Sequence, residues 1–147
     1  MDIQILSNSH KKWRDVATFA EKCSWRGGKY LAELMKSNSF NDWERVFAAF
    51  DGDKIIGFCT LTEKDELESK YPYKPLIGFV FVDEAFRGRR ISEKMICKVG
   101  EYSKSIGFAK IYIMSSEKDL YEKYDFVFVG DYDTIYGDKE HLFVKEI

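Results

Sequence analysis

Hydrophobic residues recur at different spacings in successive parts of the chain, and these spacings predict both helices and strands. Ile3 and Ile5 alternate with polar residues, as in a short first strand. Residues 10–22 and 30–35 carry apolar side chains at helical spacing, and the glycines of Arg26-Gly27-Gly28 separate them. The runs ERVFAAF and KIIGFCTLT on either side of an Asp-Gly turn predict a β-hairpin.

The second half of the chain combines one long apolar run with a helix. Segment 63–75 is polar and contains both prolines, so we expect a loop there. PLIGFVFV is typical of a central strand that is buried on both faces. An amphipathic helix that ends near Gly107 follows it, and KIYIM is the next strand, which together predict a parallel crossover. A short helix over 116–124 and the strands FVFVGDY and HLFVKEI complete the chain.

The predicted order of elements is therefore β-α-α-β-β-β-α-β-α-β-β. This order indicates an α/β fold, with a mixed sheet of the α+β type, and the length of 147 residues favours one domain over 1–147. A hydrophobic content of 45% with 16% aromatic residues is enough for a folded core.

Charge and cysteine content exclude several classes of protein. The net charge of −2 argues against a general nucleic-acid-binding protein, which usually has a basic excess. No signal pattern or apolar run of membrane-spanning length is present, so we expect no membrane association and a cytoplasmic location. Cys23, Cys59 and Cys97 have no metal-ligand spacing, so they are interpreted as buried free thiols and no metal cofactor is expected.

A basic turn between the buried strand and the long helix is a candidate anion site. Gly88 gives the backbone freedom, and the amides of Arg89, Arg90, Ile91 and Ser92 lie where a helix start can bind a pyrophosphate. Arginines here oppose the helix dipole, and a bound anion would relieve that conflict. The alternative interpretation is a solvated basic turn that precedes a packing helix.

Two segments carry a resemblance to a known family. VFVDEAFRGRRISEKMI resembles the signature of the GNAT superfamily of acyl-CoA-dependent N-acetyltransferases, in which a strand leads through R-G-x-G-x-G/A into a helix. Arg87 and Gly88 match this signature, whereas Arg90 and Ser92 stand where the family usually has glycines. DLYEKYDFVFVG resembles a second family segment, with Asp125 in place of a glycine. The resemblance covers nearly the whole chain and implies a sheet whose central parallel strands splay apart.

The resemblance implies an N-acetyltransferase that uses acetyl-CoA and acetylates a primary amine of a small molecule or peptide by direct attack in a ternary complex. The pantetheine arm would pair with the last strand residues, and the pyrophosphate would lie on the turn amides. The implied cofactor-binding residues are Phe81, Val82, Arg87, Gly88, Arg89, Arg90, Ile91 and Ser92. Tyr121 takes the place of the tyrosine that acts as general acid in many members, and Tyr124 lies three residues further on.

The sequence specifies the general base and the acceptor less well. Acidic candidates for the base lie in the 63–75 loop, and Asp65 is the first choice among Glu63, Asp65, Glu66 and Glu68. His141 lies near the expected acceptor side, although a lone histidine there is more often a surface residue. Acids beside an acceptor site favour a cationic amine. With an aromatic lining from Tyr71, Tyr73, Trp25 or Trp43, the site could hold a polyamine, an aminoglycoside-like compound or a lysine side chain.

Two other functions compete with catalysis. An acyl-CoA sensor or protein-interaction module with this fold and no turnover is motivated by the missing glycines at Arg90, Ser92 and Asp125 and by the unassigned base. A phosphate-binding protein of another α/β family is disfavoured, because the turn matches neither G-x-x-x-x-G-K-[ST] nor G-x-G-x-x-G. Many relatives dimerise, so a homodimer is one expected assembly.

Overall fold

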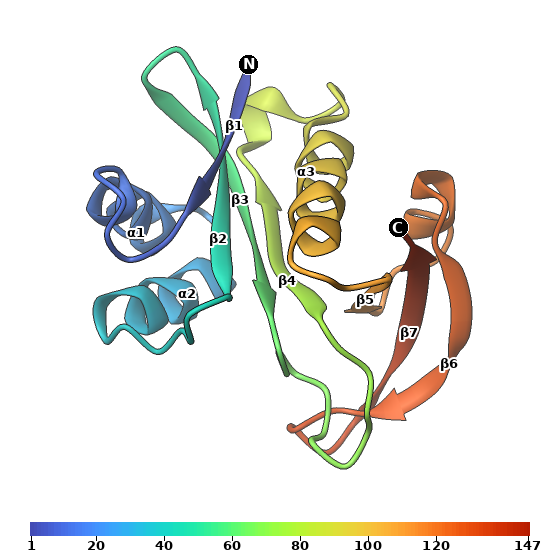
Figure 1. Ribbon diagram of the computed structural model, residues 1–147. Helices are drawn as coiled ribbons and strands as arrows, with labels where there is room; N and C mark the ends of the chain where they lie inside the picture. Colours follow the sequence, from blue (N-terminus) through green and yellow to red (C-terminus); the bar gives the residue numbers. More distant parts are fainter.

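The computed structural model describes residues 1–147 and contains a seven-stranded sheet with helices on both faces (Figure 1). The sheet order is β1-β2-β3-β4-β5-β7-β6, and only β4 and β5 pair in parallel. The strands are β1 (Asp2–Leu6), β2 (Arg45–Asp51), β3 (Lys54–Thr62), β4 (Leu76–Val82), β5 (Lys110–Ser115), β6 (Val127–Asp133) and β7 (Lys139–Glu146). The helices are α1 (Trp13–Lys22), α2 (Gly27–Lys36), α3 (Ile91–Ser105) and the 3₁₀ turns η1 (Glu84–Phe86) and η2 (Tyr121–Tyr124). The predicted order of elements and the mixed α/β class are confirmed.

The first half of the chain supplies strands β1, β2 and β3 and the two helices that cover one face of the sheet. The Asp-Gly hairpin is confirmed, with Gly52 at φ 61°, a conformation that glycine adopts without strain. Helices α1 and α2 lie side by side on this face and bury their apolar stripes against β2 and β3 (Figure 1). We call this side of the sheet the α1/α2 face.

Helix α3 covers the opposite face and connects β4 to β5 by the predicted parallel crossover (Figure 1). Its buried side includes Ile91, Met95, Ile96 and Val99, which pack with the inner residues of β3 and β5. Strands β4 and β5 pair only at two positions, Leu76 with Tyr112 and Ile77 with Ile113. Beyond Ile77 the two strands separate, so the splayed sheet is observed.

Two details differ from the sequence predictions. The predicted helix over 116–124 is reduced to the 3₁₀ turn η2, because the Ser115 hydroxyl accepts from the Glu117 amide and Asp119 has a positive φ of 68°, which interrupts a helix. The prediction of three buried thiols holds only for Cys59, since Cys23 is half-buried and Cys97 is exposed on α3. No helix of the structure is both long and apolar enough to cross a membrane.

Candidate active site

A cleft of about 770 Å³ opens where β4 and β5 have separated. Its walls come from the end of β4, the turn before α3, the segment after β5, and Trp25 between α1 and α2. The lining residues are Trp25, Val80, Phe81, Val82, Phe86, Arg87, Gly88, Arg90, Ile91, Ser92, Glu117, Leu120, Tyr121, Lys123 and Tyr124. Seven of the eight residues predicted to bind the cofactor line the cleft, all except Arg89, and so does the predicted acid Tyr121.

The turn before α3 presents a row of unpaired hydrogen-bond donors. The Arg87 amide donates to the carbonyl of Glu84, and the Lys94 amide donates to the carbonyl of Arg90. Between them, the backbone N–H groups of residues 88–93 have no acceptor within the protein. Gly88 has a φ of 83°, which turns the chain so that this row begins at the cleft. Such a row at the positive end of a 15-residue helix suits a phosphate group.

The arginines of this turn contribute to it in different ways. Arg87 donates from Nε to the carbonyl of Val82 at 3.0 Å and places its guanidinium over the Phe81 ring, so it ties the turn to β4. Arg89 lies over the ring of Phe86, outside the cleft lining. Arg90 turns outward and pairs with Glu93 at 2.9 Å. The positive side chains therefore surround the turn, and the amides form its inner surface.

Two of the three lost glycines keep a glycine-like backbone. Arg90 has a φ of 59° and Asp125 a φ of 70°, both in the left-handed region that favours glycine. Ser92 lies within α3, where a side chain is tolerated, and its hydroxyl hydrogen-bonds the Tyr124 hydroxyl at 2.9 Å. The replacements therefore leave the turn geometry in place, at the cost of local strain at Arg90 and Asp125.

Tyr121 reaches the cleft from η2 and is almost fully buried, with 7% of its surface exposed. Its ring packs edge-on against Phe126 and Tyr124. Burial raises the pKa of the Tyr121 phenol well above its ordinary value, so the group stays protonated at neutral pH. No protein group hydrogen-bonds its hydroxyl, unlike that of Tyr124, so the Tyr121 proton is available to a ligand in the cleft.

The sequence did not predict the distortion in β4, beside which Trp25 packs. Phe79 has a φ of 51°, and two residues of β4 lie opposite the single residue Cys59 of β3, so β4 contains a bulge at the point of separation. Trp25 stacks on Phe81 with ring centroids 6.1 Å apart and meets Phe79 edge-on. Gly27 is the sequence feature that indicates this packing of Trp25, because a Cβ at position 27 would lie 2.3 Å from the Trp25 ring.

Cys59 lies in the core opposite the bulge and is fully buried. Burial strongly raises the pKa of its thiol, so the sulfur remains a neutral thiol rather than a nucleophilic thiolate. A covalent acyl-cysteine at this position is therefore disfavoured, which agrees with direct transfer between two bound substrates.

The four candidate bases of the 63–75 loop have different surroundings. Asp65 packs its carboxylate directly over Gly78 of β4, where a Cβ would lie 2.1 Å from Oδ1. Burial raises the pKa of Asp65 to about 6. Glu63 pairs with Lys74 at 3.6 Å. Asp65 is therefore the candidate that lies against the strand at the opening of the gap.

The other candidates lie further from β4. The carboxyl group of Glu66 hydrogen-bonds that of Glu140, and Glu68 contacts the β6–β7 hairpin through its backbone. His141 pairs with Asp131 on the outer hairpin and packs its ring against Phe128, so the structure does not bring it to Asp65.

Comparison with known proteins agrees with this geometry. The acetyltransferase (GNAT) domain family matches residues 42–128, more than half of the chain. The protein therefore belongs to the GNAT family and is an acetyltransferase. No curated protein sequence matches the chain.

Solved structures of the same fold include aminoglycoside acetyltransferases. An aminoglycoside 6'-acetyltransferase type Ii is 19% identical over 99% of this chain and 97% of its own, with a TM-score of 0.71. An aminoglycoside 6'-N-acetyltransferase complexed with coenzyme A is 17% identical with the same coverage and a TM-score of 0.72. The aminoglycoside 6'-N-acetyltransferase from Enterococcus faecium gives the same identity, coverage and TM-score as the coenzyme A complex. At these identities the likeness shows the fold alone.

Proposed function

We propose that the protein transfers the acetyl group of acetyl-CoA to a primary amine of a small molecule or peptide. The observation that carries this proposal is one cleft in which Gly88, Arg90, Ile91 and Ser92 with their unpaired amides, the unpaired edge of β4 and the phenol of Tyr121 meet. Membership of the acetyltransferase family supports it.

The residues present fit coenzyme A. The amides from Gly88 to Ser92 would donate hydrogen bonds to the pyrophosphate oxygens, and the Arg87 and Arg90 side chains would add positive charge around them. The edge of β4 at Phe81 and Val82 lacks a strand partner on the β5 side and would pair with the amide groups of the pantetheine arm. The thioester would then lie between the β4 bulge and Tyr121.

The chemistry we propose requires one base and one acid. Asp65 holds the ammonium of the acceptor and takes its proton, so that the free amine nitrogen can attack the thioester carbonyl carbon. The new C–N bond forms, the C–S bond breaks, and the leaving sulfur receives a proton from Tyr121. The nitrogen then gives up its second proton as it becomes an amide, and the Tyr121 phenolate regains a proton. The pKa of about 6 leaves Asp65 ionised at neutral pH, and the raised pKa of Tyr121 keeps its proton in place until the sulfur develops charge.

Two measurements test this proposal. Coenzyme A at about 100 times its Kd should raise Tm by about 5–10 °C, whereas ATP at the same concentration should leave Tm unchanged. Acetyl-CoA should then release free thiol in the presence of at least one member of a broad amine panel. Absence of a Tm shift at millimolar coenzyme A would contradict the proposed cofactor site. Tight coenzyme A binding without thiol release for any amine would instead indicate a sensor.

A further inference from the structure

The 63–75 loop and the β6–β7 hairpin meet at the end of the sheet remote from the start of α3 (Figure 1). Leu67 forms a β-bridge with Thr134, and the Ile135 amide donates to the carbonyl of Glu66 at 2.9 Å. This contact brings acidic residues from distant parts of the chain together. Some of them are neutralised by cations and others are not.

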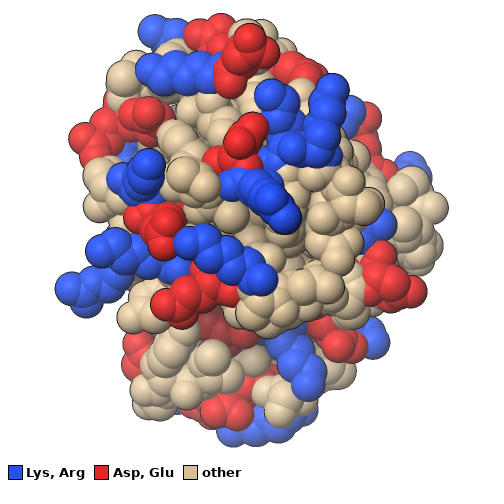
Figure 2. Space-filling view, turned by 90° about the vertical axis from the view of Figure 1, so that its left-hand side faces the viewer, with Lys and Arg blue, Asp and Glu red and all other residues tan.

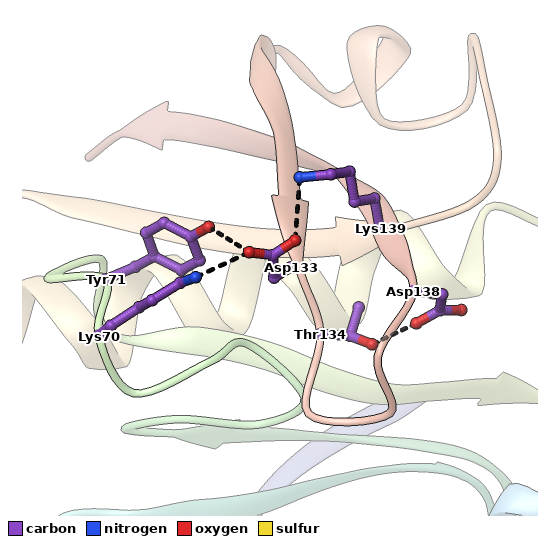
Figure 3. A network of polar contacts seen from close by, with 6 residues as sticks. All are labelled: Lys70, Tyr71, Asp133, Thr134, Asp138 and Lys139. Carbon is purple, nitrogen blue, oxygen red and sulfur yellow. Dashed lines mark hydrogen bonds and ion pairs between the residues drawn. The ribbon is translucent and has the colours of Figure 1, made fainter.

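Asp133 is the neutralised acid of this contact. It pairs with Lys70 at 2.8 Å and Lys139 at 2.9 Å, and the Tyr71 hydroxyl donates to it at 3.0 Å (Figure 3). These donors hold the pKa of Asp133 well below its usual range. Asp133 therefore ties the loop to the hairpin, and its charge is already balanced by two lysines.

Asp65, Glu66 and Glu140 form a second group, which we call the acidic triad, and it lacks such cations. None of the three forms an ion pair with a lysine or arginine. Partial burial and the neighbouring carboxyls of Glu140, Asp65 and Asp138 raise the pKa of Glu66 well above its usual range. The hydrogen bond between Glu66 and Glu140 thus retains a proton near neutral pH.

A buried hydroxyl beside the triad also lacks a partner. Thr60 is 0% exposed, and its Oγ1 makes no hydrogen bond. Thr60 pairs with Gly78 across β3 and β4, and Gly78 is the residue over which the Asp65 carboxylate lies. Side chains of directly paired residues share one face of a sheet, so the Thr60 hydroxyl points to the side occupied by Asp65. A buried polar group without a partner is costly, and a polar ligand at Asp65 would satisfy it.

Aromatic rings adjoin the other end of the triad. Glu140 pairs directly with Tyr132 across β6 and β7, so the two side chains lie on one face. Tyr132 packs edge-on against Tyr71 and Tyr73, and its hydroxyl hydrogen-bonds that of Tyr73 at 3.0 Å. Carboxyl groups beside tyrosine rings are suited to ammonium groups, which ion pairs and ring faces both attract.

Surface charge on the side of the molecule that carries α1 and α2 is mixed in sign. On the side shown in Figure 2, which carries α1 and α2, positive and negative side chains are interspersed without a large region of one sign. The three carboxyls of the triad, which have no cation partner, lie at the loop–hairpin contact.

We propose that the acceptor is a diamine or polyamine that presents two ammonium groups to the acidic triad. The amine to be acetylated binds Asp65 beside Thr60, and the second ammonium binds between the carboxyls of Glu66 and Glu140. This inference rests on the proposed acetyltransferase function and adds a second charged contact to it. It predicts that a diamine binds more tightly than a monoamine of the same length and releases a proton.

The experiment is calorimetric titration of the protein saturated with coenzyme A, using 1,4-diaminobutane and 1-aminobutane in two buffers of different ionisation enthalpy at pH 7. The diamine should bind at least about 10-fold more tightly, as expected of one charge-assisted contact, and should release a fraction of a proton. Glu66→Gln and Glu140→Gln should each abolish this preference and the proton release. Glu63→Gln, in the same loop but paired with Lys74, should preserve both.

Several outcomes would overturn the inference. Equal affinities for the two amines, a diamine preference that survives both triad substitutions, or equal competition by Mg²⁺ at the same concentration would each do so. Coenzyme A binding and acetylation of monoamines without any diamine preference would leave the acetyltransferase function intact. Absence of coenzyme A binding would instead contradict the proposed acetyltransferase function on which the inference rests.

Discussion

The two ends of β4 differ in which kind of polar group lacks a partner. At the end near α3, the amides of residues 88–93 are donors without acceptors. At the end near the 63–75 loop, the triad carboxyls are acceptors without cations. The first end is therefore suited to bind an anion and the second to bind a cation. An anionic acyl carrier and a cationic amine, the two substrates of one reaction, would supply the missing partners at both ends.

The largest expected effect concerns the phenol that lines the cleft at the end near α3. Tyr121→Phe should lower kcat by about 10²–10³-fold, because the leaving sulfur loses its proton donor. The affinity for coenzyme A should change by less than about 3-fold, since the cofactor is bound mainly by the turn amides and the β4 edge. Steady-state kinetics with acetyl-CoA, together with a binding titration of coenzyme A, give both values.

Tyr124→Phe is the matched control for this substitution. It removes the hydroxyl that bonds Ser92 and leaves Tyr121 in place. We expect a reduction in kcat of less than about 10-fold. A Tyr121→Phe rate equal to wild type, or a larger loss in Tyr124→Phe, would assign the proton transfer to another group.

The next effect concerns the cationic end alone. Asp65→Asn should lower kcat/KM by about 10²-fold, because the amide can neither bind the ammonium as an anion nor take its proton. In the wild type, kcat/KM should rise with pH through about 6, the pKa of the Asp65 carboxyl, and this limb should be absent in the variant. Glu63→Gln should keep the wild-type pH profile. An unchanged acid limb in Asp65→Asn would exclude Asp65 as the base.

The anionic end could be predicted from the sequence because it is local. The end of β4, the turn and the start of α3 are continuous in the chain, so one short motif contains the strand, the bend at Gly88 and the amides. The alternating and helical patterns likewise predicted the order of elements, and the structure confirms it. The exception is the shortened helix before Phe126, where the side-chain bond from Ser115 and the backbone of Asp119 prevailed over helical propensity.

The cationic end could not be predicted in the same way because it is assembled from distant segments. Glu66 and Glu140 are separated by most of the second half of the chain, and the contacts between the 63–75 loop and the β6–β7 hairpin, such as the pairing of Leu67 with Thr134, bring them together. The 63–75 loop contains four candidate acids, and the sequence does not indicate which of them lies against β4. The bulge at Phe79 has no sequence signal, since its left-handed φ is imposed by the strands around it.

The smallest expected effect separates the neutralised acid from the triad by stability. Asp133→Asn should lower Tm at pH 7 by about 2–4 °C, because it removes two exposed lysine pairs that connect the loop and the hairpin. Asp65→Asn and Glu66→Gln should keep or raise Tm, because each replaces a carboxyl that burial disfavours in its charged form.

The dependence on pH has opposite signs for the two kinds of acid. The lowered pKa of Asp133 means that its stabilisation is present at neutral pH and is lost as the pH falls through the acid range. The raised pKa of Asp65 means that the folded state binds more protons than the unfolded state, so its contribution to stability falls as the pH rises from about 4 to about 6. Melting curves of the variants from pH 4 to 8 measure both slopes. A greater loss of Tm at pH 7 in Asp65→Asn than in Asp133→Asn would show that Asp65 stabilises the fold, and a ligand would then not be needed to explain its position.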